Sequence, residues 1–144
     1  MDRIEDCISF MVGKAAQQVT RRARDLLAPF GVTPVQYAVL KVLSGTDGLS
    51  GREIGARMVL DSASVTGVID RLEALGFAER RPDPNDRRAH RIVATARAAG
   101  LVETMDRAMD RLNAEAAAIL GGQTGGVLRG LKALGDEGKW AGHV

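Results

Sequence analysis

One stretch of the chain, residues 77–95, interrupts an otherwise helical pattern and limits the folds that the chain can adopt. Residues 77–81 and 91–95 have the pattern of short strands. The run between them, Pro-Asp-Pro-Asn-Asp at 82–86, is rich in turn-forming residues. We therefore predict a β-hairpin over residues 77–95 with a long, charged tip.

On both sides of this hairpin, apolar side chains recur at three- and four-residue steps, which is the spacing of one helix face. Thr33 and Ser50 are predicted to cap the helices that follow them, and either Asp61 or Ser62 is predicted to begin the helix that Gly76 ends. The predicted helices cover residues 4–30, 34–43, 51–58, 62–75, 96–120 and 126–134. The fold class is therefore mainly α with a small β-hairpin.

Composition narrows the class of protein further. With 144 residues the chain has the length of one domain, and its aromatic content of 3% requires an aliphatic core, which favours helices over a β-sandwich. We expect no membrane-spanning helix and no signal peptide, because no long apolar run exists and residues 1–6 are acidic. A single cysteine and two histidines predict no disulfide, no metal site and no cofactor. We expect a cytoplasmic protein.

Positive charge is concentrated in and beside the hairpin. Residues 80–97 contain six arginines and two acidic residues, a net charge of +4, whereas the whole chain carries +2. Arginine suits bidentate contact with phosphate and insertion into narrow minor grooves. This stretch therefore predicts contact with the backbone of a nucleic acid.

The start of the fourth predicted helix is also suited to DNA. Short polar side chains there hydrogen-bond to phosphates and base edges, and a helix N-terminus favours phosphate. The alternative for Asp61 or Ser62 is a role as a helix cap only. Two short helices followed by a hairpin are the order of a winged helix-turn-helix, whose second helix enters the major groove of DNA. The sequence thus predicts such a DNA-binding lobe at residues 33–95.

Four runs of residues resemble the MarR family of bacterial transcriptional regulators. They are Leu60–Thr66, Val68–Glu73, Gly76–Arg88 and Thr33–Tyr37. The most specific part is Asp86-Arg87-Arg88 together with Asp70-Arg71-Leu72 upstream. The resemblance covers essentially the whole chain in the order and length of its helices, so residues 1–144 are expected to form one domain.

The resemblance implies a homodimer that binds a palindromic operator in double-stranded DNA and represses transcription in the bacterial cytoplasm, at the nucleoid. It implies that residues 1–30 and 96–144 form the dimerisation region, which agrees with their apolar stripes. It also implies that Arg88 reaches DNA. We infer that Asp86 holds the hairpin arginines by a charge-assisted hydrogen bond, with a simple turn as the alternative. The residues expected at DNA are Ser50, Asp61, Ser62, Ser64, Val65, Thr66, Arg71, Arg81, Asp86, Arg87 and Arg88.

Two positions depart from the pattern of the family. Val59 stands where members often have glycine, which indicates a turn that does not need a positive φ. Gly67 stands where members often have arginine, which removes one expected contact with DNA.

The resemblance further implies release from DNA by a small molecule, often a phenolic or other aromatic acid, bound between the dimerisation helices and the DNA-binding lobe. Arg21 or Arg22 is the candidate partner for the carboxylate of such an effector. The other candidate pocket residues are Met11, Ala15, Tyr37 and Met58. A plain core role is the alternative for these side chains.

Other functions remain as alternatives. Some family members sense peroxides through one cysteine in the first helix. Glu5 and Asp6 oppose thiolate formation at Cys7, which is expected on the apolar stripe, and this favours a buried structural thiol. A helical interaction module that does not bind DNA is an alternative of another class. We expect no enzyme, because His90 lies in a charged hairpin and the glycine-rich run at 121–126 lacks the residues of a phosphate loop.

Overall fold

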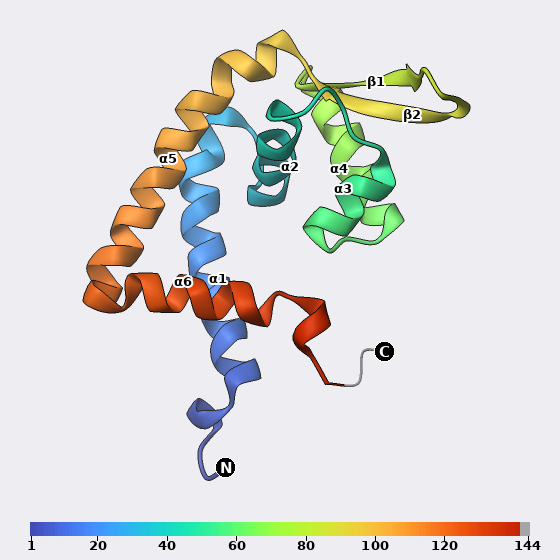
Figure 1. Cartoon of the computed structure of the whole chain (residues 1–144). Coiled ribbons are helices and arrows are strands. Elements are labelled where there is room, and N and C mark those ends of the chain that lie inside the picture. The colour runs from blue at the N-terminus through green and yellow to red at the C-terminus, as the bar shows by residue number, and fades with distance from the viewer. Residues whose placement is uncertain (142–144) are drawn as a thin grey trace. The chain divides into compact units, whose positions relative to one another are not determined.

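The computed structural model describes residues 1–141, so the end of the predicted dimerisation segment 96–144, including His143, lies outside the described residues. The chain divides into two compact units, the first ending at Met109 and the second beginning at Asp110. Figure 1 labels the helices and strands in chain order. They are α1 (Ile8–Leu27), α2 (Pro34–Ser44), α3 (Gly51–Met58), α4 (Ser62–Ala74), β1 (Ala78–Asp83), β2 (Asp86–Ala94), α5 (Ala96–Leu120) and α6 (Thr124–Leu134).

The single helix predicted over residues 4–30 is wrong at both ends. The structure has a short 3-10 turn at Ile4–Asp6 before α1 and another at Ala28–Phe30 after it. Cys7 separates the first turn from α1 with an extended backbone (φ −85°, ψ 114°). At the other end, Pro29 cannot donate the N–H that a further α-helical turn requires. The helix therefore tightens into the 3-10 turn and ends at Gly31, whose φ is 71°.

The predicted caps are confirmed and fix where α2, α3 and α4 begin. Thr33 and Ser50 each form a capping box, with the side chain accepting the N–H of the residue three positions on. Asp61 caps α4, because its Oδ1 accepts the N–H of Ser64 at 2.7 Å. Ser62 is therefore the first residue of α4 rather than its cap.

The first unit is built around α2. This helix contacts α1, α3, α4 and β2, and it buries Leu40 and Leu43 completely. Leu27 of α1, Leu72 of α4 and Met105 of α5 complete the most deeply buried part of the core. As the composition predicts, this core is mainly aliphatic, with Phe77 as its buried aromatic side chain.

The hairpin is confirmed, but its tip is shorter than expected. The antiparallel strands β1 and β2 place Arg80 opposite Ile92 and Pro82 opposite His90, and Asp83 pairs with Asp86. The turn between the strands therefore consists of residues 84 and 85 alone, because residues 82, 83 and 86 belong to the strands. At its base, Leu49 pairs with Ile92 in a β-bridge with hydrogen bonds of 3.0 and 2.7 Å. This bridge joins the hairpin to the loop after α2.

In the second unit the end of α5 is followed by a 3-10 turn at Gly121–Gln123 and by α6. None of the residues of α6 is buried, and its three large apolar side chains, Leu128, Leu131 and Leu134, are exposed. Trp140 follows α6 and donates its Nε1–H to the carbonyl of Leu134 at 2.9 Å. Within residues 1–141, no single helix has the length and apolarity to cross a membrane, although the bent pair 8–30 and 34–44 meets that test by length and composition.

Candidate nucleic-acid interface

The helix α4 presents one apolar face to the core and one small, polar face to solvent. Val65, Ile69 and Leu72 recur at helical spacing and are buried. Val65, which the sequence analysis placed at DNA, is 3% exposed and therefore belongs to the core. The exposed positions of the predicted set on this helix are Ser62, Ser64, Thr66 and Arg71.

The N-terminus of α4 is capped by a carboxylate, that of Asp61. The backbone N–H and the hydroxyl of Ser64 hold the pKa of the Asp61 carboxyl below its ordinary value, so this side chain is ionised at neutral pH. The carboxylate accepts a hydrogen bond from an N–H of the first turn, and its negative charge complements the positive end of the helix dipole. Asp61 therefore defines how α4 begins, while Ser50 does the same for α3.

The turn between α3 and α4 differs from the expectation. Val59 has φ 54° and ψ 51°, so the prediction that this turn does not need a positive φ is wrong. The left-handed residue ends α3 and lets the N–H of Leu60 donate to the carbonyl of Gly55 at 2.9 Å. A Cβ at position 55 would lie 3.0 Å from the Leu60 carbonyl oxygen, so this close turn favours a glycine there. The Val59 side chain is 82% exposed.

Four of the six arginines around the hairpin are engaged inside the protein. Arg80 on β1 is the clearest case, since its Nη2 lies 2.8 Å from Asp70 Oδ1 and its Nη1 pairs with Glu73. Both carboxylates are on α4, one helical turn apart, so this guanidinium fastens β1 to α4. It is a structural residue of the interface and not a free cation.

Of the other three, Arg91 and Arg97 contact residues at the base of the hairpin, and Arg81 pairs along its own strand. Arg91 donates from Nη2 to the carbonyl of Gly48 at 3.0 Å, and Arg97 lies over the Phe77 ring at 5.6 Å from its centroid. Arg81, which was predicted to reach DNA, is exposed and pairs with Glu79 on the same strand. The net charge of +4 around the hairpin therefore overstates the number of cations that are available to a phosphate.

The tip of the hairpin carries the two available cations. Arg87 and Arg88 are exposed at the start of β2, and no carboxylate within residues 1–141 forms an ion pair with either. Asp86 accepts the backbone N–H of Arg88 at 2.9 Å, so the inference that its carboxylate holds arginine side chains is wrong. A bond two residues along the chain is the simpler turn contact of an aspartate, and it shapes the backbone that carries Arg88.

This combination of elements is found in known proteins. A family model described as "MarR family" matches residues 30–89. The regulator TtmR of Methylorubrum extorquens is 41% identical over 103 residues, which cover 72% of this chain and 53% of TtmR, so the chain spans about half of that relative. The structure of a probable transcriptional regulator from Pseudomonas aeruginosa is 30% identical with a TM-score of 0.83, over 91% of this chain and 98% of that one. The chain belongs to the MarR family.

A second structure of similar shape is that of CouR from Rhodococcus jostii RHA1, solved with p-coumaroyl-CoA. It is 26% identical, with a TM-score of 0.79, over 100% of this chain and 99% of that one. These matches confirm the predicted family and the mainly helical fold with its two-stranded hairpin. Membership in a family of transcriptional regulators also agrees with the expectation that the chain is not an enzyme.

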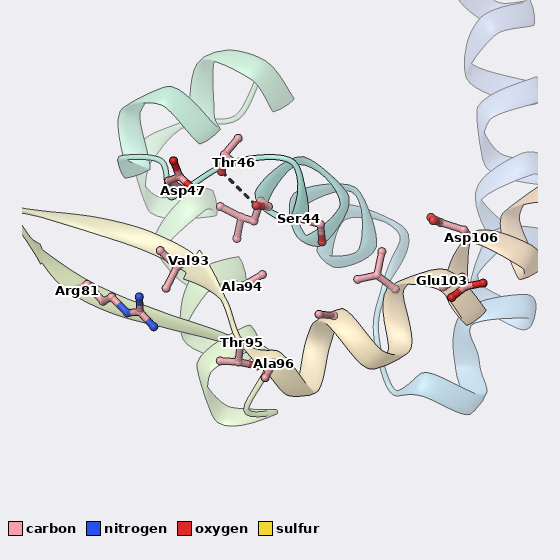
Figure 2. A pocket seen from close by; sticks show the side chains of 13 residues that line it. Ser44, Thr46, Asp47, Arg81, Val93, Ala94, Thr95, Ala96, Glu103 and Asp106 are labelled. Atoms are coloured by element: carbon pink, nitrogen blue, oxygen red, sulfur yellow. Dashed lines mark hydrogen bonds between the residues drawn. The ribbon is translucent and has the colours of Figure 1, made fainter.

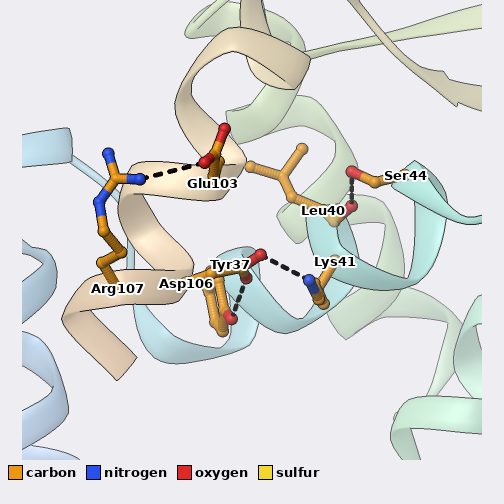
Figure 3. Close-up of polar contacts among 7 residues, drawn as sticks. All are labelled: Tyr37, Leu40, Lys41, Ser44, Glu103, Asp106 and Arg107. Carbon is orange, nitrogen blue, oxygen red and sulfur yellow. Dashed lines mark hydrogen bonds and ion pairs between the residues drawn. The ribbon is translucent and has the colours of Figure 1, made fainter. Parts of the chain in front are cut away.

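In this MarR-family chain, a polar cluster links α2 to α5. The Tyr37 hydroxyl donates to Asp106 Oδ1 at 2.7 Å, and Lys41 Nζ lies 2.6 Å from Asp106 Oδ2 (Figure 3). The hydrogen bond from Lys41 is the main cause that holds the pKa of the Asp106 carboxyl below its ordinary value; burial opposes it, and the hydrogen bond from Tyr37 adds a smaller lowering. Tyr37, predicted to contact an effector, thus serves this cluster.

One hollow in the first unit has a volume of about 620 Å³. Figure 2 shows side chains from the end of α2, the base of the hairpin and the start of α5 around it. Its polar lining includes Asp47, Arg81, Thr95, Glu103 and Asp106. None of the six residues predicted for an effector lines it.

Those six residues lie elsewhere and are not brought together within the first unit. Met11 and Ala15 are exposed on α1, and Arg21 lines a smaller hollow of about 340 Å³ with Thr20 and Arg24. Arg22 is half-buried on α1. Tyr37 and Met58 pack against the core.

Cys7 does not occupy the buried position that the sequence analysis favoured. It lies between the first 3-10 turn and α1, with an extended backbone, and its side chain is only half-buried. The expectation was wrong because Cys7 was assigned to the apolar stripe of the first helix, and that helix begins one residue later, at Ile8.

Proposed function

We propose that this chain is a DNA-binding transcriptional regulator that inserts α4 into the major groove and contacts the neighbouring minor groove or backbone with the hairpin tip. The observation that carries this proposal is the pair of exposed guanidiniums of Arg87 and Arg88, which form no ion pair among residues 1–141, on a hairpin that Arg80 connects to α4. The fold adds support, since the repressor CouR has been solved on a 23-mer DNA duplex with a TM-score of 0.84 to this chain. A regulator of bacterial transcription would act in the cytoplasm, at the nucleoid.

The regulator acts as a homodimer on a palindromic operator. Large apolar side chains on α1 and α6 are exposed in the single chain, which is unusual for a monomer and typical of an interface. Two copies would present two α4 helices, and each would read one half-site about 34–36 Å from the other along B-DNA. The exposed apolar residues of these helices include Ile8, Phe10, Met11, Val12, Val19, Leu128, Leu131 and Leu134.

The test of this function is selection of duplexes from a random DNA library by the full-length protein. We expect enrichment of an inverted repeat whose half-sites are one helical turn apart, and binding of that duplex by two protomers. The matched control is the same duplex with one half-site scrambled, which should bind much more weakly. Failure to enrich any sequence, together with no DNA binding at low salt, would overturn the proposal.

We further propose that a small effector, an aromatic acid or its thioester, releases the regulator and relieves repression. The support is the likeness to CouR, which was solved with p-coumaroyl-CoA, and to BpsR, whose DNA binding is regulated by 6-hydroxynicotinic acid. Arg21 or Arg22 would bind the carboxylate or phosphate groups, and a shift of a few ångströms between the two α4 helices would lower affinity for the operator. Thermal-shift and operator-binding measurements across a panel of aromatic acids and thioesters test this, since no response to any of them would contradict it.

A further inference from the structure

The exposed face of α4 carries unusually short side chains. Ala63, Thr66 and Gly67 are three and four residues apart and therefore share one face. All three are exposed, and a Cβ built at Gly67 would meet nothing within 4 Å. Asp70 follows on the same face, but its carboxylate is paired with Arg80. The first turns of α4 therefore bring their backbone close to any base pair that they face.

The polar groups on this face are already engaged. The Thr66 hydroxyl donates to the carbonyl of Ser62 at 2.9 Å. A hydroxyl has one proton, so this bond leaves Thr66 without a donor for a base edge. The Ser64 hydroxyl acts on the Asp61 carboxylate at the cap of the helix. Thr66 can therefore offer a base edge only the lone pairs of its hydroxyl oxygen, as an acceptor, or its γ-methyl group.

We propose that Thr66 reads thymine through its γ-methyl group rather than through its hydroxyl, with the Ala63 methyl beside it on the same face. This inference rests on the proposed insertion of α4 into the major groove. Thymine is the base that presents a methyl group there, at C5, and small apolar side chains recognise it by contact. The open space at Gly67 permits the close approach that a contact between two methyl groups requires.

The test separates the two groups of Thr66 with a matched pair of variants. Thr66→Val keeps the methyl and loses the hydroxyl, whereas Thr66→Ser keeps the hydroxyl and loses the methyl. Both are measured on the selected operator and on operators in which uracil replaces one thymine at a time, a change that removes only the C5 methyl. Circular dichroism and thermal unfolding check that both variants are folded.

We expect wild type and Thr66→Val to bind the operator with similar affinity, and each to lose about fourfold when the contacted thymine becomes uracil. Thr66→Ser should bind the thymine operator about sixteenfold more weakly, a factor of about four for each of the two protomers, and should no longer distinguish uracil from thymine at that position. A loss in Thr66→Val with full binding by Thr66→Ser would overturn the inference, because the hydroxyl oxygen would then be the reading group.

Two other outcomes also overturn it, and they are distinguishable. Wild type that binds its operator but responds to uracil at no position contradicts the methyl readout and leaves the DNA-binding function intact. Wild type that binds no duplex at all contradicts the DNA-binding function and this inference with it.

Discussion

Val59 combines a left-handed backbone with a side chain branched at Cβ, and nothing in the core compensates for it, because the side chain is 82% exposed. Left-handed backbone costs a residue other than glycine about 1–2 kcal/mol. The cost arises where the chain turns from α3 into α4, at the edge of the candidate interface. Strain of this kind is often retained at functional sites.

We expect Val59→Gly to raise the free energy of unfolding by about 1 kcal/mol, because glycine adopts this conformation without strain and its greater freedom in the unfolded chain offsets part of the gain. Urea unfolding of the two proteins measures the difference. Val59→Ala is the control, since it shortens the side chain but keeps the Cβ, and it should gain less. Unfolding of Val59→Gly at a lower urea concentration than wild type would contradict the strain.

Residue by residue, the sequence predicted local chemistry better than partnerships across the fold. The caps at Thr33 and Ser50 were predictable because a cap depends on residues three positions apart. The roles of Arg80 and Arg91 were not, because their partners at Asp70 and Gly48 are distant in sequence and meet them only in the folded chain. Val59 was misjudged because the need for a positive φ comes from the angle between two helices, which composition does not reveal.

At the scale of elements, the ion pairs of Arg80 hold the hairpin against α4. Removing this guanidinium frees Asp70 and Glu73 and lets β1 move relative to α4. We expect Arg80→Ala to lower stability by about 1 kcal/mol or less and to weaken operator binding. The dependence of binding on salt should stay as in wild type, because Arg80 is already neutralised by carboxylates. A reduced salt dependence would show instead that Arg80 meets phosphate.

The contact between α2 and α5 has its own pH dependence. Because the folded pKa of Asp106 is lowered, its ion pair with Lys41 stabilises the folded protein above the ordinary carboxyl pKa of 3.8 and loses this effect as pH falls below that value. We expect Asp106→Asn to be less stable than wild type at pH 7, by about 1 kcal/mol. Urea unfolding at pH 7 and pH 3 should show this difference shrinking in acid, and a constant difference would contradict the assignment.

At the scale of the whole molecule, the proposed homodimer would bury the exposed apolar side chains of α6. We expect Leu131→Asp to dissociate the dimer, because it places a charge in the apolar stripe, whereas Lys132→Asp at the neighbouring exposed position should leave the dimer intact. Sedimentation velocity at micromolar concentration distinguishes the two states. A Leu131→Asp variant that sediments like wild type would exclude α6 from the interface.

The central claim, that the hairpin tip meets the DNA backbone, is tested most directly by the salt dependence of operator binding. Each arginine that neutralises a phosphate contributes about 0.9 to the slope of log affinity against log salt concentration. Arg88→Ala should therefore reduce the slope by about 1 for each protomer, while Arg107→Ala, which removes an exposed arginine paired with Glu103 on α5, should leave it unchanged. A slope that is the same in Arg88→Ala and wild type would contradict the account.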